Sequence, residues 1–184
     1  MNNYGEYLCL IKNNHIALKL NIHTKNYVIL NTNYYTMKQI DKIGIAADHA
    51  GYDLKKELID YLTNLGYKVK NFGTDSSESV DYPDFAHPLA EAVENGTCTF
   101  GISICGSGNG ISMAVNKHPK IRAALSWNEE ISKLARLHND ANICSLPARF
   151  IDVETAKKII DTFLNTEFEG GRHERRVKKI SLNQ

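Results

Sequence analysis

The sequence predicts an α/β fold: a three-layer α/β/α sandwich on a Rossmann-like, five-stranded parallel sheet, with an N-terminal appendage. From Met37 onwards, short apolar runs alternate with amphipathic segments. This alternation is typical of a parallel sheet that is covered by helices on both faces. The third apolar run leads directly into a glycine-rich loop. Such a loop lies at the carboxyl end of a strand, where open parallel sheets bind ligands. A chain of 184 residues is long enough to bury one such core.

Residues 1–36 differ in composition from the rest of the chain. They are rich in Asn, Tyr, Lys and Ile, and they contain no Pro and one Gly. Residues 15–22 and 26–31 could form strands, but no helix follows them to complete a parallel unit. We expect residues 1–36 to be a poorly packed extension or upstream sequence translated from a mis-assigned start, and residues 37–184 to be a single domain. An added β-hairpin is the alternative.

The first half of the domain predicts two strands and two helices. The apolar run 43–47 is the first strand. Apolar residues from Leu54 to Leu65 recur at helical spacing, and Gly66 follows at the position where a left-handed C′ glycine commonly ends a helix. Residues 67–72 form the second strand, and a helix then runs from Pro83 to about Gly96.

The second half repeats this alternation. The expected strands span residues 99–105, 121–126 and 142–146, and the expected helices span residues 110–116, 129–138 and 152–164. Asp152 is placed to cap the N-terminus of the last helix with its side chain. The tail from Glu169 to Gln184 carries several arginines.

Composition excludes several classes of function. A net charge of +1 and a pI near 7.7 argue against nucleic-acid or membrane-surface partners. No apolar run approaches the roughly 18 residues that a transmembrane helix requires. The four cysteines show neither CxxC pairing nor metal-finger spacing, and the chain begins without a secretory signal. These features predict reduced thiols, a cytoplasmic location and no metal site.

The glycine-rich loop after residues 99–105 is the strongest functional signal. In the stretch Gly101–Ala114, GISICGSGNGISMA, three alternating glycines let successive N–H groups point at one negative charge. The loop lacks the lysine of a P-loop, and its GxGxG spacing after the third strand leaves only a weak dinucleotide-binding interpretation. A tight turn that binds nothing is the simpler alternative.

Four chemically useful side chains follow strands and so share one edge of the predicted sheet. Asp48 and His49 follow the first strand, Cys105 ends the third, and Arg149 follows the fifth. The loop N–H groups would favour the thiolate of Cys105, which could then act as a nucleophile or as a general base. A cysteine that ends a buried strand is otherwise most often a small hydrophobic residue.

A second set of polar residues belongs to the opposite edge. His138 and Asn139 end a helix that runs antiparallel to the strands, and Arg172 and Arg176 follow the last helix. If these residues act together with Cys105, a second subunit must supply them across a two-fold interface. Otherwise His138 caps its own helix and the arginines form a solvated tail.

Five segments, taken together and in this order, carry a resemblance to a known family. They are Gly44–Gly51, Asp81–Asp84, Ile104–Ser112, Arg136–Asn142 and Glu169–Arg176. In them the chain resembles the sugar-phosphate isomerases that include type B ribose-5-phosphate isomerase and galactose-6-phosphate isomerase. The resemblance covers residues 38 to about 180 and leaves residues 1–36 outside it.

The resemblance implies a cofactor-free aldose–ketose isomerisation, most like that of ribose 5-phosphate to ribulose 5-phosphate in the pentose phosphate pathway. It implies that His138 and Asp48 open the sugar ring and that Cys105 removes the C2 proton. The enediolate would be held by the Ser107 hydroxyl and by main-chain N–H groups of the loop. The loop residues involved would be Gly106, Gly108, Asn109 and Gly110.

The same resemblance implies how the rest of the substrate is bound. Arg172 and Arg176 would grip the phosphate near Arg149 and His49, and paired guanidiniums suit that task. Tyr82 and Asn139 would contact the sugar; these two complete the expected set. The expected assembly is a homodimer with a shared active site, with a tetramer as the alternative. An allose- or galactose-6-phosphate isomerase and a non-catalytic sugar-phosphate- or nucleotide-binding module are the competing functions.

Overall fold

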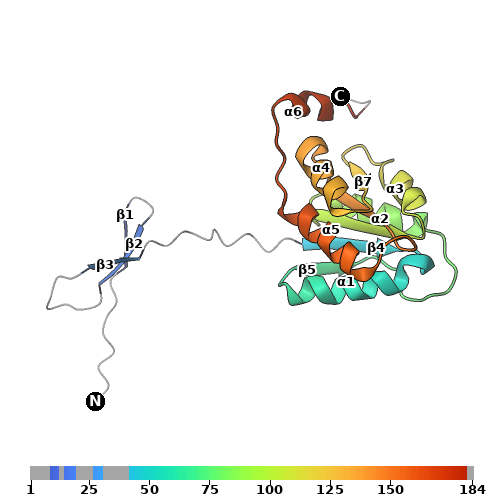
Figure 1. The fold of residues 1–184 in the computed structure, drawn as a ribbon, viewed down its shortest axis with the longest axis horizontal. Coiled ribbons are helices and arrows are strands. Elements are labelled where there is room, and N and C mark those ends of the chain that lie inside the picture. Colours follow the sequence, from blue (N-terminus) through green and yellow to red (C-terminus); the bar gives the residue numbers. More distant parts are fainter. Residues whose placement is uncertain (1–8, 13–14, 20–26, 31–41, 182–184) are drawn as a thin grey trace, which may run out of the picture. The chain divides into compact units, whose positions relative to one another are not determined.

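A parallel five-stranded sheet forms the centre of the described part of residues 40–184 (Figure 1). The computed structural model describes residues 9–12, 15–19, 27–30 and 42–181. The strands are β4 (Lys42–Ala47), β5 (Lys68–Asn71), β6 (Phe100–Cys105), β7 (Ala123–Leu125) and β8 (Ile143–Pro147). Their order in the sheet is β5-β4-β6-β8-β7, and every neighbouring pair is parallel. The predicted α/β sheet is therefore confirmed.

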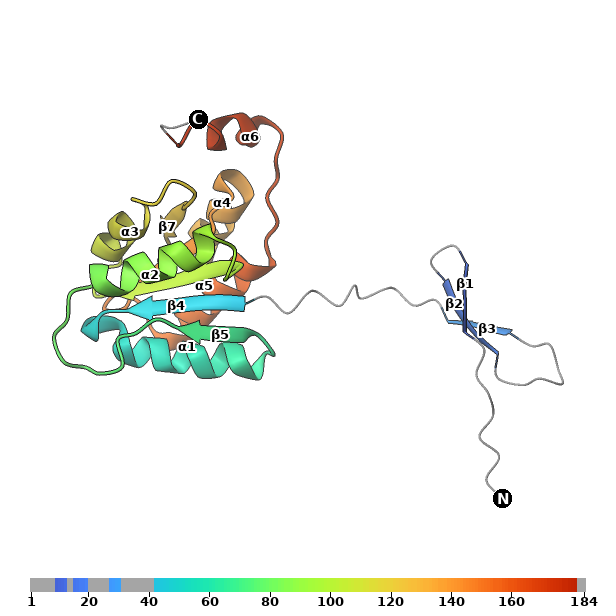
Figure 2. The same cartoon turned by 180° about the vertical axis from the view of Figure 1, so that it is seen from behind.

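Helices cover both faces of this sheet, as Figures 1 and 2 show from opposite sides. One face packs against α1 (Tyr52–Asn64), α4 (Glu129–Asn139) and α5 (Val153–Asn165). The other face packs against α2 (Pro83–Glu94) and α3 (Asn109–Val115). A single 3-10 turn, η1 (His49–Gly51), links β4 to α1. Each face has its own cluster of buried apolar side chains, so the sheet is the middle of three layers.

The burial of each strand follows from its place in the sheet. The central strands β6 and β8 are buried almost throughout, and both read as apolar runs because helices cover them on two sides. The edge strand β5 has the sequence KVKN and is largely exposed. Lysines on an edge strand discourage pairing with another sheet.

The helix boundaries follow the predicted signals. The carboxylate of Asp152 accepts a hydrogen bond of 2.7 Å from the N–H of Thr155 at the start of α5. Asn128 caps α4 in the same way, with a 2.9 Å hydrogen bond from the N–H of Ile131. Gly66 follows α1 with a φ of 89°. In the tail, Arg172–Val177 forms a further short helix, α6, which contacts α4 and is not among the helices that the sequence predicted.

Residues 1–39 make a separate unit. Its described strands, β1 (Cys9–Lys12), β2 (His15–Lys19) and β3 (Tyr27–Leu30), pair antiparallel in that order. The latter two fall within the segments expected to be able to form strands, and β1 adds a third. That residues 1–36 are an extension or come from a mis-assigned start stays a prediction. Among the described residues, no helix combines the length and apolar character needed to cross a membrane.

Candidate active site

A cavity of about 450 Å³ opens at the carboxyl ends of the central strands. Its walls come from the segments that follow β4, β6 and β8 and from the start of α2. The lining residues are Asp48, His49, Ala50, Tyr82, Cys105, Gly106, Ser107, Gly110, Arg149 and Phe150. Eight of the predicted site residues therefore meet in one chain. Gly108 and Asn109 belong to the same loop but do not line the cavity.

Cys105 lies where β6 ends and the glycine loop begins. Its side chain is 5% exposed and lines the cavity. Gly108 directly precedes α3 and has a φ of 73°. A residue with a Cβ adopts this left-handed conformation only at a cost in free energy. Among the hydrogen bonds of the described residues, none comes from the N–H groups of Gly106, Ser107, Gly108 or Gly110. The loop therefore offers several main-chain donors to an anion beside the sulfur.

Two glycines of the loop allow close approach by side chains that wall the cavity. A Cβ at Gly106 would stand 3.2 Å from Nε of Arg149. A Cβ at Gly110 would stand 2.8 Å from Cζ of Tyr82. The Arg149 side chain thus lies over the loop backbone, and the Tyr82 ring packs on the first turn of α3. Both contacts depend on the absence of a side chain at these two positions.

Asp48 and His49 face the loop from the end of β4. One carboxylate oxygen of Asp48 accepts from the N–H groups of Ala50 and Gly51, at 2.9 and 3.1 Å. This bonding occupies one oxygen and holds the carboxylate in place, so the other oxygen remains for a ligand. His49 engages the backbone of Val80 through Nδ1 at 3.3 Å, which leaves its Nε2 as the nitrogen available to a bound group.

The other described cysteines have different surroundings. Burial raises the pKa of Cys144 to about 12 and also raises the pKa of Cys98. Both thiols therefore stay protonated near neutral pH and are poor nucleophiles or bases. Cys98 and Cys144 each pack in one of the two apolar clusters.

His138, Asn139, Arg172 and Arg176 lie at the opposite end of the sheet. His138 and Asn139 end α4 just before β8 begins, whereas Arg149 follows the end of β8. The five residues of β8, at about 3.3 Å each, separate these two ends by about 16 Å. Within one chain, the structure therefore brings the two predicted halves of the site to opposite edges.

The predicted second half of the site makes ordered contacts within this chain. The rings of His138 and His173 stack in parallel, with centroids 4.1 Å apart and planes inclined by 2°. Nε2 of His138 lies 3.7 Å from Oε2 of Glu169. Arg172 donates from Nε to Nε2 of His173 at 3.2 Å. Arg172 and Arg176 are otherwise exposed on α6, so they are accessible to another subunit.

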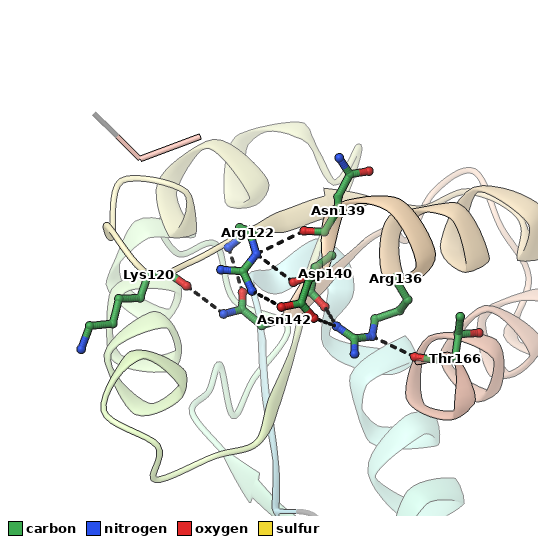
Figure 3. Close-up of polar contacts among 8 residues, drawn as sticks. Lys120, Arg122, Arg136, Asn139, Asp140, Asn142 and Thr166 are labelled. Atoms are coloured by element: carbon green, nitrogen blue, oxygen red, sulfur yellow. Dashed lines mark hydrogen bonds and ion pairs between the residues drawn. The ribbon is translucent and has the colours of Figure 1, made fainter. Parts of the chain in front are cut away.

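Asp140 holds the end of α4 that carries His138 and Asn139 (Figure 3). It has a left-handed backbone with a φ of 45°. Its two carboxylate oxygens accept from Nη1 of Arg136 at 2.9 Å and from Nη2 of Arg122 at 2.8 Å. Nε of Arg122 also donates to the carbonyl oxygens of Asn139 and Asp140, at 3.2 and 2.8 Å. Two guanidiniums thus fix the backbone at Asn139.

A model of the ribose/galactose isomerase family matches residues 43–180. This chain belongs to the ribose/galactose isomerase family. Ribose-5-phosphate isomerase B of Escherichia coli is 43% identical over 140 residues, which cover 76% of this chain and 94% of that protein.

Solved structures of family members agree with this assignment. Ribose-5-phosphate isomerase B from Clostridium thermocellum is 54% identical and superposes with a TM-score of 0.75, covering 76% of this chain and 94% of that one. The Mycoplasma genitalium enzyme, solved with bound ribulose-5-phosphate, is 42% identical with a TM-score of 0.73, covering 76% of this chain and 93% of that one. The family match begins at residue 43, so residues 1–36 lie outside it.

Sequence reasoning missed several residues that line the cavity or contact His138. Phe150 lines the cavity although 75% of its surface is exposed, and no local sequence signal marks it apart from its position after Arg149. Ala50 also lines the cavity, as part of the η1 turn that links β4 to α1. His173 and Glu169 were within a recognised segment, but nothing in the sequence indicated their contacts with His138.

His138, Glu169 and His173 bring their ligand atoms within 4.8 Å of one another. Such a group could in principle hold a metal ion. However, an imidazole nitrogen directs its lone pair within the plane of its ring, and these two planes are stacked and nearly parallel. The two lone pairs therefore do not converge on one point, and this arrangement does not suit a metal ion.

Proposed function

We propose that this chain interconverts ribose 5-phosphate and ribulose 5-phosphate without a cofactor. Its family consists of aldose–ketose isomerases, and the relatives at 43% and 54% identity are named ribose-5-phosphate isomerase B. The Mycoplasma genitalium relative was solved with ribulose-5-phosphate bound. The observation that carries the proposal is the sulfur of Cys105 beside unpaired loop N–H groups in a cavity.

In the proposed reaction, the Cys105 thiolate takes the C2 proton of the open-chain aldose. The C–H electron pair forms the C1–C2 double bond, and negative charge moves onto the former carbonyl oxygen. The N–H groups of Gly106, Gly108 and Gly110 and the Ser107 hydroxyl donate to that oxygen. The thiol returns the proton to C1, and transfer of the O2 proton to O1 completes the ketose. A positioned base contributes roughly 10²–10⁴ in rate, and one donor of such a hole contributes about 10²–10³.

Ring opening must precede this step for a furanose substrate. Asp48, with one oxygen uncommitted, takes the proton of the anomeric hydroxyl. His138 of the partner subunit protonates the ring oxygen. The proposal needs a homodimer because His138 lies at the far edge of its own sheet.

Phosphate binding also draws on both subunits. His49 and Arg149 come from the chain that supplies Cys105, whereas Arg172 and Arg176 come from the partner. Guanidiniums can each give two parallel hydrogen bonds to phosphate. Tyr82 and Asn139 contact the sugar from the two sides. The buried, unpaired thiols of Cys98 and Cys144 support a reducing, cytoplasmic location.

The decisive experiment compares Cys105→Ala with Cys144→Ala. Both remove a buried thiol from a central strand of the sheet, but only the first removes the proposed base. Cys105→Ala should lower kcat on ribose 5-phosphate by at least about 10² while ribulose 5-phosphate still binds in calorimetry. Cys144→Ala should keep its kcat. Unchanged turnover in Cys105→Ala would exclude the thiol as the base.

Substrate preference is tested with five- and six-carbon aldose phosphates, without added metal or nucleotide. We expect the highest kcat/KM with ribose 5-phosphate. A higher value with allose or galactose 6-phosphate would move the assignment to the six-carbon branch of the same chemistry. Binding without turnover of any of them would support a non-catalytic module instead.

A further inference from the structure

His173 is the one buried residue of α6, with 5% of its surface exposed. The helix has six residues, too few to be stable without packing. It stands apart from the layers and contacts α4 (Figures 1 and 2). The position of α6 therefore depends largely on how His173 packs. The proposed mechanism gives His173 no part, although its neighbours Arg172 and Arg176 are proposed to bind the substrate phosphate.

Two contacts of His173 reach residues of the proposed site. Its ring face lies on the ring of His138, with centroids 4.1 Å apart and planes inclined by 2°. Its Nε2 receives the hydrogen bond from Nε of Arg172 at 3.2 Å. One imidazole thus contacts both the residue proposed to protonate the ring oxygen and a residue proposed to bind the phosphate.

The hydrogen bond from Arg172 fixes the protonation state of His173. A guanidinium has only donors, so Nε2 of His173 must carry a lone pair and the ring proton must sit on Nδ1. The charged groups around the ring are His138 on α4, Arg172 and Arg176 on α6, and Glu169 before α6. Desolvation lowers the pKa of His173, His138 and the two arginines lower it further, and Glu169 opposes them. The ring is therefore neutral near pH 7.

We propose that His173 is a positioning residue that orients Arg172 for the substrate phosphate and His138 for ring opening. This inference rests on the function proposed above. The stacked ring limits rotation of the His138 side chain, which also lies 3.7 Å from Oε2 of Glu169 through its Nε2. The Nε2 acceptor limits the directions in which Arg172 can present its remaining donors.

Two substitutions separate these contacts. His173→Phe keeps an aromatic face on His138 but removes the acceptor for Arg172. His173→Gln keeps an acceptor oxygen near the position of Nε2 but removes the aromatic face. Arg175→Ala is the matched control, because Arg175 lies exposed on the same helix and has no part in the mechanism.

His173→Phe should raise KM for ribose 5-phosphate and Ki for inorganic phosphate by the same factor, about two- to tenfold, with kcat nearly unchanged. His173→Gln should lower kcat by about tenfold, with KM nearly unchanged. Exchange of the C1 hydrogens of ribulose 5-phosphate with solvent deuterium should stay fast in His173→Gln. That exchange needs Cys105 but no ring opening, because a ketopentose phosphorylated at O5 cannot close a furanose ring.

The inference fails if both variants match Arg175→Ala in KM, Ki and kcat. It also fails if both lose kcat and KM together with a lowered melting temperature, since that result describes a merely structural residue. A readout independent of turnover is the nitrogen NMR spectrum of labelled imidazoles, which should show neutral, Nδ1-protonated His173 at pH 7. An Nε2-protonated ring would overturn the inference, whereas inactive wild-type protein with the expected spectrum would overturn only the proposed function.

Discussion

Replacing Gly108 by Ala tests how strictly the loop backbone is required. Gly108 has a φ of 73°, and an added Cβ would lie 2.3 Å from Cδ1 of Leu125 and 3.1 Å from the carbonyl carbon of Leu146. The Leu125 side chain can move, but the Leu146 backbone belongs to a central strand and yields little. The change therefore combines a backbone penalty with a steric one.

Gly96→Ala isolates the backbone penalty. Gly96 has a φ of 76°, and an added Cβ there meets no atom within 4 Å. The left-handed conformation costs an alanine about 1–2 kcal/mol, and the reduced entropy of the unfolded chain offsets about 0.4–1 kcal/mol. We expect Gly96→Ala to lose about 1 kcal/mol of unfolding free energy. At Gly108 overpacking adds a further cost of about 1–3 kcal/mol. The free energy of unfolding should therefore fall by about 2–4 kcal/mol in Gly108→Ala.

Urea denaturation of the two variants, followed by circular dichroism, measures this difference. Isomerase assays on the same samples measure the second consequence, because a displaced loop misdirects at least one N–H donor. We expect kcat of Gly108→Ala to fall by about 10²–10³, and kcat of Gly96→Ala to match the wild type. Equal stabilities for the two variants, or full activity in Gly108→Ala, would refute the loop geometry on which the proposed function depends.

Three further predictions concern other parts of the site. Iodoacetamide should inactivate the enzyme by labelling Cys105 and not the fully buried Cys144, with protection by ribulose 5-phosphate; peptide mapping that finds the label elsewhere would contradict this. Asp140→Asn keeps a residue that tolerates a left-handed backbone. It should lower the free energy of unfolding by about 1–3 kcal/mol, because the guanidiniums of Arg122 and Arg136 no longer face a carboxylate. A urea midpoint equal to that of Asp60→Asn, an exposed control, would show that the pairs contribute nothing. Acidification from about pH 7.5 to about pH 5 should destabilise the wild type relative to His173→Phe. The pKa of His173 is lowered in the folded protein, so the unfolded chain binds the proton at a higher pH than the folded chain does. A difference in urea midpoint that stays constant with pH would contradict this prediction.

The fold was largely predictable because its signals are local. Apolar runs, caps such as Asp152 and the C′ glycine at Gly66 each act within a few residues, and the structure places every predicted strand of the sheet within two residues or so of its expected ends. α6 was not predicted because its six residues include three arginines and no apolar periodicity. Its stability comes from His173 packing on α4, a contact between segments about 35 residues apart in the sequence.

The cavity half of the site was predictable for a different reason. Parallel strands place their carboxyl ends at one edge, so side chains that directly follow β4, β6 and β8 had to meet there. The same rule could not find Phe150, because a large exposed apolar residue after a strand carries no positional signal of its own. Nor could it show that Asp140 is held by two arginines, since those contacts depend on the packing of loops at the other edge.

A site shared between two chains would explain why several polar groups at the amino edge are each held by more than one contact. His138 stacks on His173, Arg172 bonds to the same ring, and Asn139 sits on a backbone that Arg122 and Asp140 clamp. None of these residues lines the cavity of its own chain. Because these side chains are already held in place, less side-chain entropy is lost when a substrate binds in the cavity of a neighbouring subunit. The rigid amino edge is therefore the feature expected if each chain completes the cavity of another.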